Sequence, residues 1–386
     1  MSPRLIVTGG GSVSQIADVL RKFGLSRPLI VTDPVMVSTG LVEKCRAPLL
    51  AAGRDAVVFS DTVPDPTDTV VEAGVAALGR GAFDCLIGFG GGSPMDTAKA
   101  IAILAGSGGK MRDHKVPVAA DRAALPVIAI PTTGGTGSEC TRFTVITDTE
   151  RDEKMLIAGL GALPLAAIVD YELTFSVLPR TTADTGVDSL THALEAYVSR
   201  RANAFSDALA LSAMRLIGAH LRDAYREPTN RAAREGMMLG SMQAGLAFSN
   251  SSVALVHGMS RPIGAHFHVP HGLSNAMLLP AVTAFSLGAA MSRYAEAARR
   301  VGVAAPDAPD EAASAQLVPA LQALNRDLAV PSPRAWGIDR ARWEALVPTM
   351  AEQAIASGSP ANNPRVPNAG EIAAIYRDIW SGETEQ

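Results

Sequence analysis

Aromatic residues, net charge and cysteine are all scarce in this 386-residue sequence, and each shortage excludes a class of protein. Aromatic residues make up 5% of the chain, which argues against the base-stacking surfaces of proteins that bind single-stranded nucleic acid. Charged residues make up 19% and the formal net charge is −4, so no basic surface favours binding to nucleic acid or to a membrane. The length suits two domains, each with its own core.

The three cysteines, Cys45, Cys85 and Cys140, are far apart and odd in number. They fit neither a disulfide framework nor a C-x-x-C zinc site, and they suit a reducing compartment. The N-terminal sequence lacks the charged, apolar and small-residue pattern of a secretion signal. No uninterrupted apolar run reaches the ~18 residues of a membrane-spanning helix. We therefore expect a cytoplasmic protein.

Two common nucleotide-binding fingerprints are also missing. No G-K-[ST] follows a glycine run, and the first expected strand is followed by Gly9-Gly10-Gly11-Ser12 where a G-x-G-x-x-G motif would stand. Low-complexity tracts and internal repeats are absent as well. The sequence therefore does not predict a P-loop or a standard Rossmann domain.

The first half of the chain alternates short apolar runs with amphipathic stretches. This alternation is typical of a parallel sheet covered by helices on both faces. The expected strands are 4–8, 27–32, 57–59, 84–89, 124–130 and 167–169, and the expected helices are 14–23, 68–79 and 95–105.

The pattern changes after Leu178-Pro179, where long stretches rich in Ala, Leu and Met follow with few strand signals. Ala, Leu and Met favour helices. The expected helices there are 185–200, 204–221, 231–247, 287–301 and 311–328. We therefore predict an α/β nucleotide-binding domain over 1–178 and an all-helical domain over 179–386.

Four of the seven histidines fall in one window, 253–275. They are His257, His266, His268 and His271. Imidazole is a common metal ligand and a common general acid or base. The alternative is a polar surface loop that happens to be rich in histidine.

A carboxylate and an imidazole share one face of the predicted helix 185–200. Asp188 and His192 are four residues apart, so both project from the same side of the helix. They form half of a divalent-metal site, and His257 and His271 could supply the other half. An isolated pair of this kind is more often a hydrogen-bonded surface pair.

Three signals follow expected strands, where α/β folds bind ligands. The run Gly88–Pro94 precedes a helix, so its backbone can approach a diphosphate; tight packing is the alternative. Asp33 can accept hydrogen bonds from a ribose 2′-hydroxyl and would repel a 2′-phosphate, although Asp before Pro is also a common turn former. The loop Pro131–Glu139 carries hydroxyls and glycines that suit a nicotinamide amide or phosphates, or it is simply a loop.

Taken together, these segments resemble the iron-activated (group III) alcohol dehydrogenases. The resemblance is carried by GGGSPMDTAKA, PTTGGTGSE with TRFTVITD, DSLTHALEAYVS and HGMSRPIGAHFHVPHGLSNA, in the order and spacing of the family and over nearly the whole chain. It implies a dehydroquinate-synthase-like architecture, with an α/β nucleotide-binding domain, an all-α domain and a cleft between them. It also implies NAD as cofactor, with Fe(II), Zn, Mn, Ni or Co as the metal.

The resemblance carries the roles of the family's residues over to this chain. It implies that the metal ligands are Asp188, His192, His257 and His271. The implied cofactor contacts are Asp33, Asp65, Gly91, Gly92, Ser93, Asp96, Thr132, Thr133 and Lys154. Asp65 stands where the family usually has Asn, which leaves that contact open.

A second departure lies beside the substrate. Many members of the family have a histidine four residues after the third metal ligand, where this chain has Arg261. His266 or His268 could take over a proton-relay role, so the candidate catalytic residues are His257, Arg261, His266 and His268. Arg261 could bind a substrate carboxylate or phosphonate, or it could form a salt bridge with a local acid. Arg142 is a second, weaker candidate for an anion contact.

The resemblance implies Lewis-acid activation and hydride exchange between a small primary alcohol or aldehyde and NAD(H). Alternatives within the family are a dehydrogenase for acidic semialdehydes, such as a 4-hydroxybutyrate-like substrate, and a maleylacetate reductase. More distant ones are a dehydroquinate-synthase-type lyase and a non-enzymatic scaffold with the same fold. The family also implies a homodimer or larger homo-oligomer.

Overall fold

The structure, a computed structural model, describes residues 1–380 and divides into two compact units. The first unit is Met1–Val177, and the second begins at Leu178. The change of pattern after Leu178-Pro179 thus coincides with the division of the chain.

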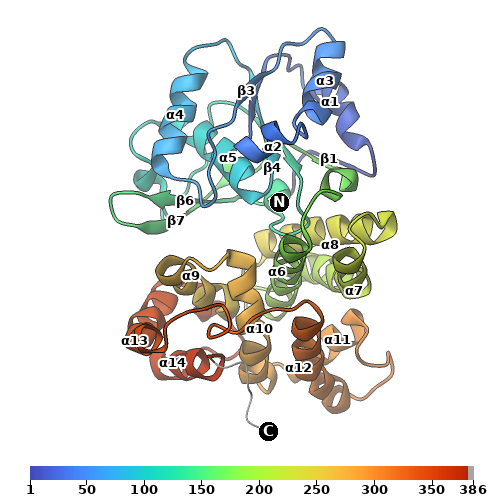
Figure 1. Ribbon diagram of the computed structural model, residues 1–386, viewed down its shortest axis with the longest axis vertical. Coiled ribbons are helices and arrows are strands. Elements are labelled where there is room, and N and C mark those ends of the chain that lie inside the picture. Colours follow the sequence, from blue (N-terminus) through green and yellow to red (C-terminus); the bar gives the residue numbers. More distant parts are fainter. Residues whose placement is uncertain (381–386) are drawn as a thin grey trace. The chain divides into compact units, whose positions relative to one another are not determined.

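The first unit is built on a six-stranded, fully parallel sheet with the strand order β1-β8-β5-β4-β2-β3 (Figure 1). Its strands are β1 (Leu5–Thr8), β2 (Pro28–Val31), β3 (Val57–Phe59), β4 (Cys85–Gly90), β5 (Val127–Pro131) and β8 (Ala166–Val169). The central strands β2, β4, β5 and β8 are buried along their whole length. Burial on both faces explains why they read as continuous apolar runs.

Helices cover both faces of this sheet. They are α1 (Ile16–Lys22), α2 (Pro34–Ser38), α3 (Glu43–Ala51), α4 (Asp68–Leu78) and α5 (Gly92–Ser107). Successive strand residues face opposite ways, so Leu29 packs with Val71 of α4 and Ile101 of α5. Ile30 packs on the other face with Leu20 of α1 and with α3. The predicted α/β architecture of this half is confirmed.

A two-stranded antiparallel hairpin stands apart from the main sheet. Its strands are β6 (Phe143–Asp148) and β7 (Glu153–Ala158). Residues along β6 alternate between half-buried and buried positions, which is the period of a strand. This hairpin was not predicted from the sequence.

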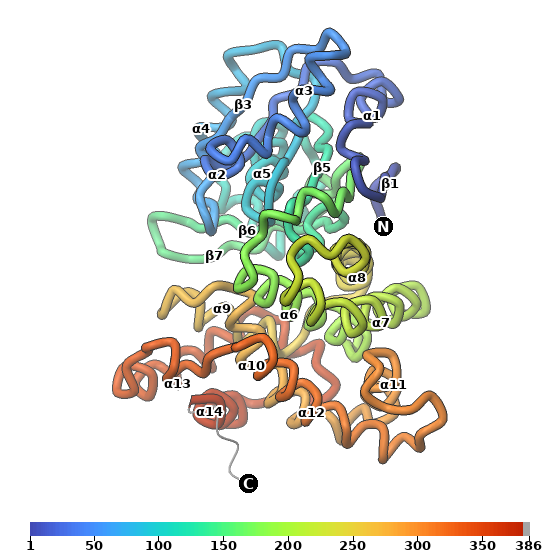
Figure 2. Tube along the Cα trace, turned by 45° about the vertical axis from the view of Figure 1, so that its right-hand side comes forward, coloured from blue at the N-terminus to red at the C-terminus, as the bar shows by residue number. Residues whose placement is uncertain are grey.

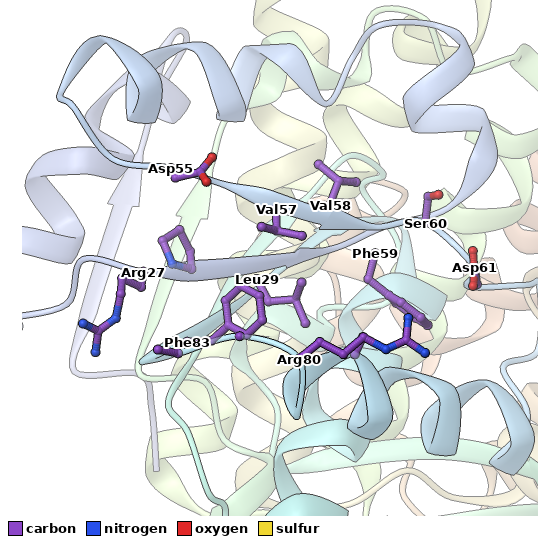
Figure 3. Close-up of a pocket in the computed structure, with 14 residues that line it drawn as sticks. Arg27, Leu29, Asp55, Val57, Val58, Phe59, Ser60, Asp61, Arg80 and Phe83 are labelled. Atoms are coloured by element: carbon purple, nitrogen blue, oxygen red, sulfur yellow. The ribbon is translucent and has the colours of Figure 1, made fainter.

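A pocket runs along the edge strand β3 (Figure 3). Val57, Phe59, Arg80 and Phe83 are among the residues that line it. None of the expected cofactor contacts lies in its wall. The pocket is therefore lined by residues other than those expected to bind the cofactor.

The second unit is helical throughout its described residues (Figure 2). Its helices are α6 (Pro179–Val198), α7 (Ala204–Arg226), α8 (Arg231–Asn250), α9 (Leu255–Phe267), α10 (His271–Leu287), α11 (Met291–Val301), α12 (Asp310–Asp327), α13 (Arg340–Ala356) and α14 (Ala369–Asp378). A 3-10 turn, η6 (Ser359–Asn362), separates the last two. The predicted helix 287–301 is wrong at its start, because α10 ends at Leu287 and α11 begins only at Met291.

Helix α6 lies at the core of this unit and packs against α7, α8 and α10. It begins with Pro179 at its first turn, a favourable position because proline lacks the N–H that would stay unbonded there. The start of α10 approaches it closely at Gly272, where an added Cβ would lie 2.4 Å from the carbonyl oxygen of Asp184. Glycine at this position therefore lets His271 come next to α6.

Candidate metal centre and cofactor site

Three helices bring a carboxylate and three imidazoles together, and we call Asp188, His192, His257 and His271 the donor cluster. Asp188 and His192 come from α6, His257 from the first turn of α9, and His271 from the first residue of α10. Asp188, His192 and His257 are buried, and each offers a ligand atom within 4.8 Å of the other two. The predicted pairing of a helical Asp-His pair with distant histidines is therefore what the structure shows.

The distances place Asp188 at the centre of the donor cluster. Its Oδ1 atom lies 3.8 Å from His192 Nδ1, 3.5 Å from His257 Nε2 and 3.8 Å from His271 Nε2. The His192 and His257 rings stack with centroids 4.4 Å apart. His271 is the most open member, with 41% of its side chain exposed. The open side of the cluster is therefore the side of His271.

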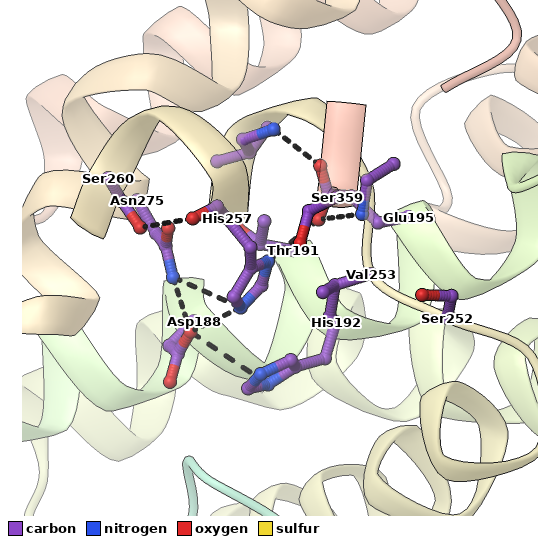
Figure 4. A network of polar contacts seen from close by, with 12 residues as sticks. Asp188, Thr191, His192, Glu195, Ser252, Val253, His257, Ser260, Asn275 and Ser359 are labelled. Carbon is purple, nitrogen blue, oxygen red and sulfur yellow. Dashed lines mark hydrogen bonds and ion pairs between the residues drawn. The ribbon is translucent and has the colours of Figure 1, made fainter. Parts of the chain in front are cut away.

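Asn275 of α10 shows what kind of group the donor cluster accommodates (Figure 4). Its Nδ2 atom lies 2.7 Å from Asp188 Oδ1 and 3.3 Å from both His257 Nε2 and His271 Nε2. A carboxylate oxygen and unprotonated imidazole nitrogens are all acceptors, so the space between them favours an N–H group or a cation. Three nitrogens and one oxygen, without thiolate, fit Fe(II), Zn, Mn, Co or Ni.

The electrostatics of the donor cluster also favour a cation. Burial on its own raises the pKa of the Asp188 carboxyl, but His192, His271 and His257 outweigh it and hold the pKa below its ordinary value. Burial lowers the pKa of His257, whereas its hydrogen bonds to Asp188 and Glu195 raise it, to about 9. Two carboxylates thus lie around one imidazole, and this concentration of negative charge suits a divalent ion.

Glu195 and Asn275 are residues of this site that the sequence analysis missed. Glu195 Oε2 lies 2.7 Å from His257 Nδ1, on the side of the ring opposite Asp188. A signal was available, because Glu195 follows His192 by three residues and Asn275 follows His271 by four. Both spacings put the second residue on the same helix face as a ligand candidate.

Two other catalytic candidates, His266 and His268, lie at the C-terminal end of α9. His266 is nine residues beyond His257 on α9, about 13 Å along the helix axis, and bonds Gln353 Oε1 at 2.9 Å. His268 is exposed at the end of α9, in the left-handed conformation with φ of 53°. The proton-relay role of His266 or His268 therefore stays a prediction.

Arg261 lies one helical turn after His257, and its side chain reaches the C-terminal segment. Its Nη1 donates to Ser359 Oγ at 3.2 Å. Burial lowers the pKa of its guanidinium, and the charge of Glu195 partly offsets this effect. The hydrogen bond of Arg261 is thus to a serine of its own unit, and both interpretations of Arg261 remain predictions. Arg142 stacks over Phe143, with its guanidinium carbon 5.4 Å from the ring centroid.

In the first unit, three neighbouring strands bring the expected cofactor residues to one edge of the sheet. Asp33 follows β2, Gly91 follows β4 and Thr132 follows β5, and β4 lies between the other two strands. Thr132 donates from its backbone N–H to Gly90 at 2.9 Å. Because the carboxyl ends of parallel strands meet at one edge, this edge is where an α/β sheet binds a nucleotide.

The turn between β4 and α5 is shaped for close approach. Helix α5 begins at Gly92 and its first backbone N–H groups have no partner within the helix, which favours an anion there. An added Cβ at Gly92 would lie 2.9 Å from Thr136 Cγ2, so the turn and the loop after β5 are in contact. Gly91, Ser93 and Thr133 lie on the same two loops.

Asp96 of α5, an expected cofactor contact, binds protein groups through its carboxylate. Its Oδ1 accepts from Ser138 Oγ at 2.7 Å, and its Oδ2 accepts from the backbone N–H of Val145 at 2.9 Å. Burial raises the pKa of Asp96, against the opposing charge of Lys99. Both carboxylate oxygens thus bind protein groups, and Asp96 fastens the loop after β5 to α5.

Lys99, one turn further along α5, hydrogen-bonds the loop after β5 from within the core. It is fully buried, and its Nζ donates to Ser138 O at 2.6 Å, Ser138 Oγ at 2.8 Å and Phe143 O at 2.9 Å, with longer contacts to Thr141. Burial lowers its pKa to about 8, although Asp96 and Glu139 act in the other direction. Lys99 and Asp96 together make the loop a fixed part of the fold.

Two expected contacts pair with each other. Lys154 of β7 lies 2.7 Å from Asp65 Oδ1, and Asp65 adopts a left-handed backbone with φ of 52°. Asn and Asp are the non-glycine residues that tolerate this conformation best. Asp65 thus has a backbone conformation that Asn would also tolerate, and its carboxylate forms an ion pair with Lys154.

Comparisons with known proteins agree with this arrangement. A family model described as iron-containing alcohol dehydrogenase matches residues 3–171, and a C-terminal model of the Fe-containing alcohol dehydrogenase family matches 182–380. The chain is 37% identical to an NAD-dependent methanol dehydrogenase of Bacillus methanolicus over 97% of this chain and 98% of the relative. It is 36% identical to a lactaldehyde reductase of Escherichia coli K12 over 96% and 97%.

The fold has solved counterparts as well. The crystal structure of a 1,3-propanediol oxidoreductase matches with a TM-score of 0.93 at 35% identity, over 98% of both chains. None of the helices within residues 1–380 combines the length and the apolar character needed to span a bilayer.

Proposed function

The chain belongs to the iron-containing alcohol dehydrogenase family and is an NAD-dependent oxidoreductase that interconverts alcohols and aldehydes, and we propose that the donor cluster holds its metal ion. The observation that carries this proposal is the convergence of buried donor atoms from Asp188, His192 and His257 within 4.8 Å of one another. His271, whose Nε2 lies 3.8 Å from Asp188 Oδ1, completes four ligands. The family's cofactors are a divalent metal, iron in the first place, and NAD.

The chemistry divides between the two bound groups and the protein. When bound, the metal supplies Lewis-acid polarisation of the substrate oxygen and the nicotinamide supplies or accepts the hydride. Asp188 would hold the metal through a negatively charged oxygen, and the three imidazoles would hold it through neutral nitrogens. Asp188, His192 and His257 are buried, so a positive charge that they hold acts in a medium of low dielectric constant.

For the cofactor, we propose the edge formed by β2, β4 and β5. The N-terminus of α5, with Gly91, Gly92 and Ser93, suits the diphosphate, and Thr132 and Thr133 suit the nicotinamide side. Asp33 favours NAD over NADP because its carboxylate repels a 2′-phosphate. Asp96 supports this site indirectly, because it holds the loop that carries Thr132 and Thr133. Lys154 contributes through its ion pair with Asp65.

We propose neutral short-chain alcohols and aldehydes as substrates. The relatives at 35–37% identity include proteins named for methanol, lactaldehyde and 1,3-propanediol, none of which carries a charge. Arg261 is the candidate that would favour acidic aldehydes. Its guanidinium instead hydrogen-bonds Ser359 and is attracted to the charge of Glu195. An acidic semialdehyde is therefore the second candidate.

The test is NADH oxidation by metal-free protein reconstituted with Fe(II) under nitrogen, with a panel of small aldehydes. Half of the panel is neutral, and half carries a carboxylate of matched chain length. We expect turnover only with metal and mainly with the neutral aldehydes. Turnover confined to the carboxylated half would replace the neutral substrates by acidic ones, and full turnover without metal would refute the metal mechanism.

The assembly and location of the protein are proposed on family grounds. We propose a homodimer or larger homo-oligomer, which light scattering at several concentrations tests directly. A cytoplasmic location is supported by the three free, buried thiols of Cys45, Cys85 and Cys140.

A further inference from the structure

Glu195 makes three hydrogen bonds that together join α6, α9 and the donor cluster. It is buried, with 3% of its surface exposed. Its carboxylate accepts from the backbone N–H of Ala254 at 2.8 Å and of Val256 at 2.5 Å, and it lies 2.7 Å from His257 Nδ1. Figure 4 shows Glu195 and Asp188 on opposite sides of the His257 ring.

The first two bonds explain how α9 begins. The helix starts at Leu255, and the residue before it, Ala254, has no side chain that could cap the free N–H groups. Glu195, a residue of another helix, supplies the missing acceptor. Its negative charge also lies at the positive end of the α9 dipole.

The third bond fixes the proton of His257. An ionised carboxylate only accepts hydrogen bonds, so the proton between Glu195 and His257 belongs to Nδ1 of the imidazole. Neutral imidazole then has its lone pair on Nε2. That atom lies 3.5 Å from Asp188 Oδ1 and 3.3 Å from Asn275 Nδ2, inside the donor cluster.

We propose that Glu195 is a positioning residue for the metal ion, because it holds His257 in the tautomer and orientation that direct Nε2 to the metal. The proposal rests on the metal site of the proposed function. A carboxylate behind a ligating histidine fixes the ring and raises its basicity, and removing such a partner typically lowers metal affinity by about 10–100-fold.

Arg261 belongs to the same arrangement. It lies one turn after His257, its charge acts on Glu195, and it bonds Ser359 of η6. The guanidinium thus places a positive charge where it is attracted to the buried Glu195 carboxylate. This place gives Arg261 a function on the Nδ1 side of His257.

The experiment measures metal affinity and does not depend on turnover. Full-length protein is stripped of metal and titrated with Co²⁺ under nitrogen against a competing chelator, with the visible spectrum of the bound ion recorded. We expect Glu195→Gln to raise the dissociation constant for Co²⁺ about 10–100-fold and to change that spectrum. Unchanged affinity together with an unchanged spectrum would reduce Glu195 to a helix cap and overturn the proposal.

A matched control separates positioning from stability. Asn230 caps α8 in the same unit by accepting from the backbone N–H of Ala233 at 3.1 Å. Asn230→Ala should lower the melting temperature and leave the dissociation constant for Co²⁺ as in the wild type. If the wild type itself binds no Co²⁺, the proposed function fails, whereas equal binding by wild type and Glu195→Gln refutes only the positioning role.

A measurement on the unaltered protein covers the case in which the variant does not fold. Histidine labelled with ¹⁵N is incorporated, the protein is loaded with Zn²⁺, and His257→Asn assigns the ring signals. We expect His257 Nδ1 to carry a proton that exchanges slowly, with Nε2 unprotonated. A protonated Nε2 and a bare Nδ1 would contradict the proposal.

Discussion

The amide nitrogen of Asn275 lies 2.7 Å from Asp188 Oδ1, in the space that the donor cluster surrounds. It gives three acceptor atoms a shared donor, while Asn275 Oδ1 is buried and has no hydrogen-bond partner among the described residues. The amide nitrogen of Asn275 thus serves the acceptors around it, whereas the amide oxygen receives no hydrogen bond from them. This imbalance is what one expects where a cation, and not an amide, is the natural partner of the cluster.

Asn275→Ala tests whether a cation is the natural partner of the donor cluster. Without metal, the variant leaves a buried carboxylate without its donor, and we expect a loss of about 1–3 kcal/mol in the free energy of unfolding. Metal binding should restore more stability to the variant than to the wild type. Thermal unfolding with and without Zn²⁺ measures the difference.

Asn363 offers the control, because it is also a buried asparagine of the helical unit and bonds Ser286 Oγ at 2.8 Å. Asn363→Ala should lower stability by the same amount with and without metal. An equal effect of Zn²⁺ on all three proteins would show that Asn275 has no part in the metal site.

Asp33 is predicted to set the choice between the two nicotinamide cofactors. Its Oδ1 caps α2 through Val35 and Met36, at 2.9 and 3.0 Å, so the carboxylate is held at the end of β2. Asp33→Gly removes the charge that repels a 2′-phosphate. We expect the ratio of kcat/KM for NADPH to that for NADH to rise at least tenfold, about 1.4 kcal/mol. Asp61→Gly, beyond the neighbouring strand, should leave that ratio unchanged.

The loop after β5 carries a titrating group of its own. Burial raises the pKa of Glu139 to about 7, against the opposing effects of a backbone hydrogen bond and of Lys99. The folded protein thus binds this proton more tightly than the unfolded chain does. The contribution of Glu139 to stability falls as the pH rises from the unfolded pKa, 4.5, through 7.

Glu139→Gln removes that dependence. The melting temperature of the variant relative to the wild type should therefore increase between pH 5 and pH 8. Glu150→Gln, at an exposed position in the same unit, should shift the melting temperature by a constant amount. Parallel curves for Glu139→Gln and the wild type would refute the raised pKa.

Arg261 is predicted to act through Glu195 and not on the substrate. Arg261→Met should lower kcat/KM for neutral and for carboxylated aldehydes by the same factor, on the order of tenfold. Arg200→Met is the control, since Arg200 also reaches the η6 segment, bonding Ala361 O at 3.4 Å. A loss confined to the carboxylated aldehydes would restore Arg261 as a substrate contact.

The sequence predicted the parts of this molecule that local rules control. Apolar runs placed the parallel strands, and the four-residue spacing of Asp188 and His192 placed two donors on one helix face. The break after Leu287 and the hairpin of β6 and β7 were missed, although Gly288 and the alternation along β6 offered signals.

Contacts that arise only from tertiary packing were beyond the sequence. Nothing near Glu195 indicates that its partners are the backbone of Ala254 and Val256, some sixty residues away. The same holds for Lys99, whose buried ammonium bonds a loop forty residues further on. In the sequence, such side chains look like ordinary surface charges, and only the folded structure shows that they are buried.

The most direct test of the account is metal titration of the stripped protein, with activity recorded at each step. For the wild type, NADH-dependent reduction of a neutral aldehyde should rise from zero and reach its plateau at one Fe(II) per chain. His257→Ala should bind less than a tenth of that iron at the same free concentration and stay inactive. Full activity of the stripped wild type, or full iron binding by His257→Ala, would contradict the claim that the donor cluster is the metal site of this enzyme.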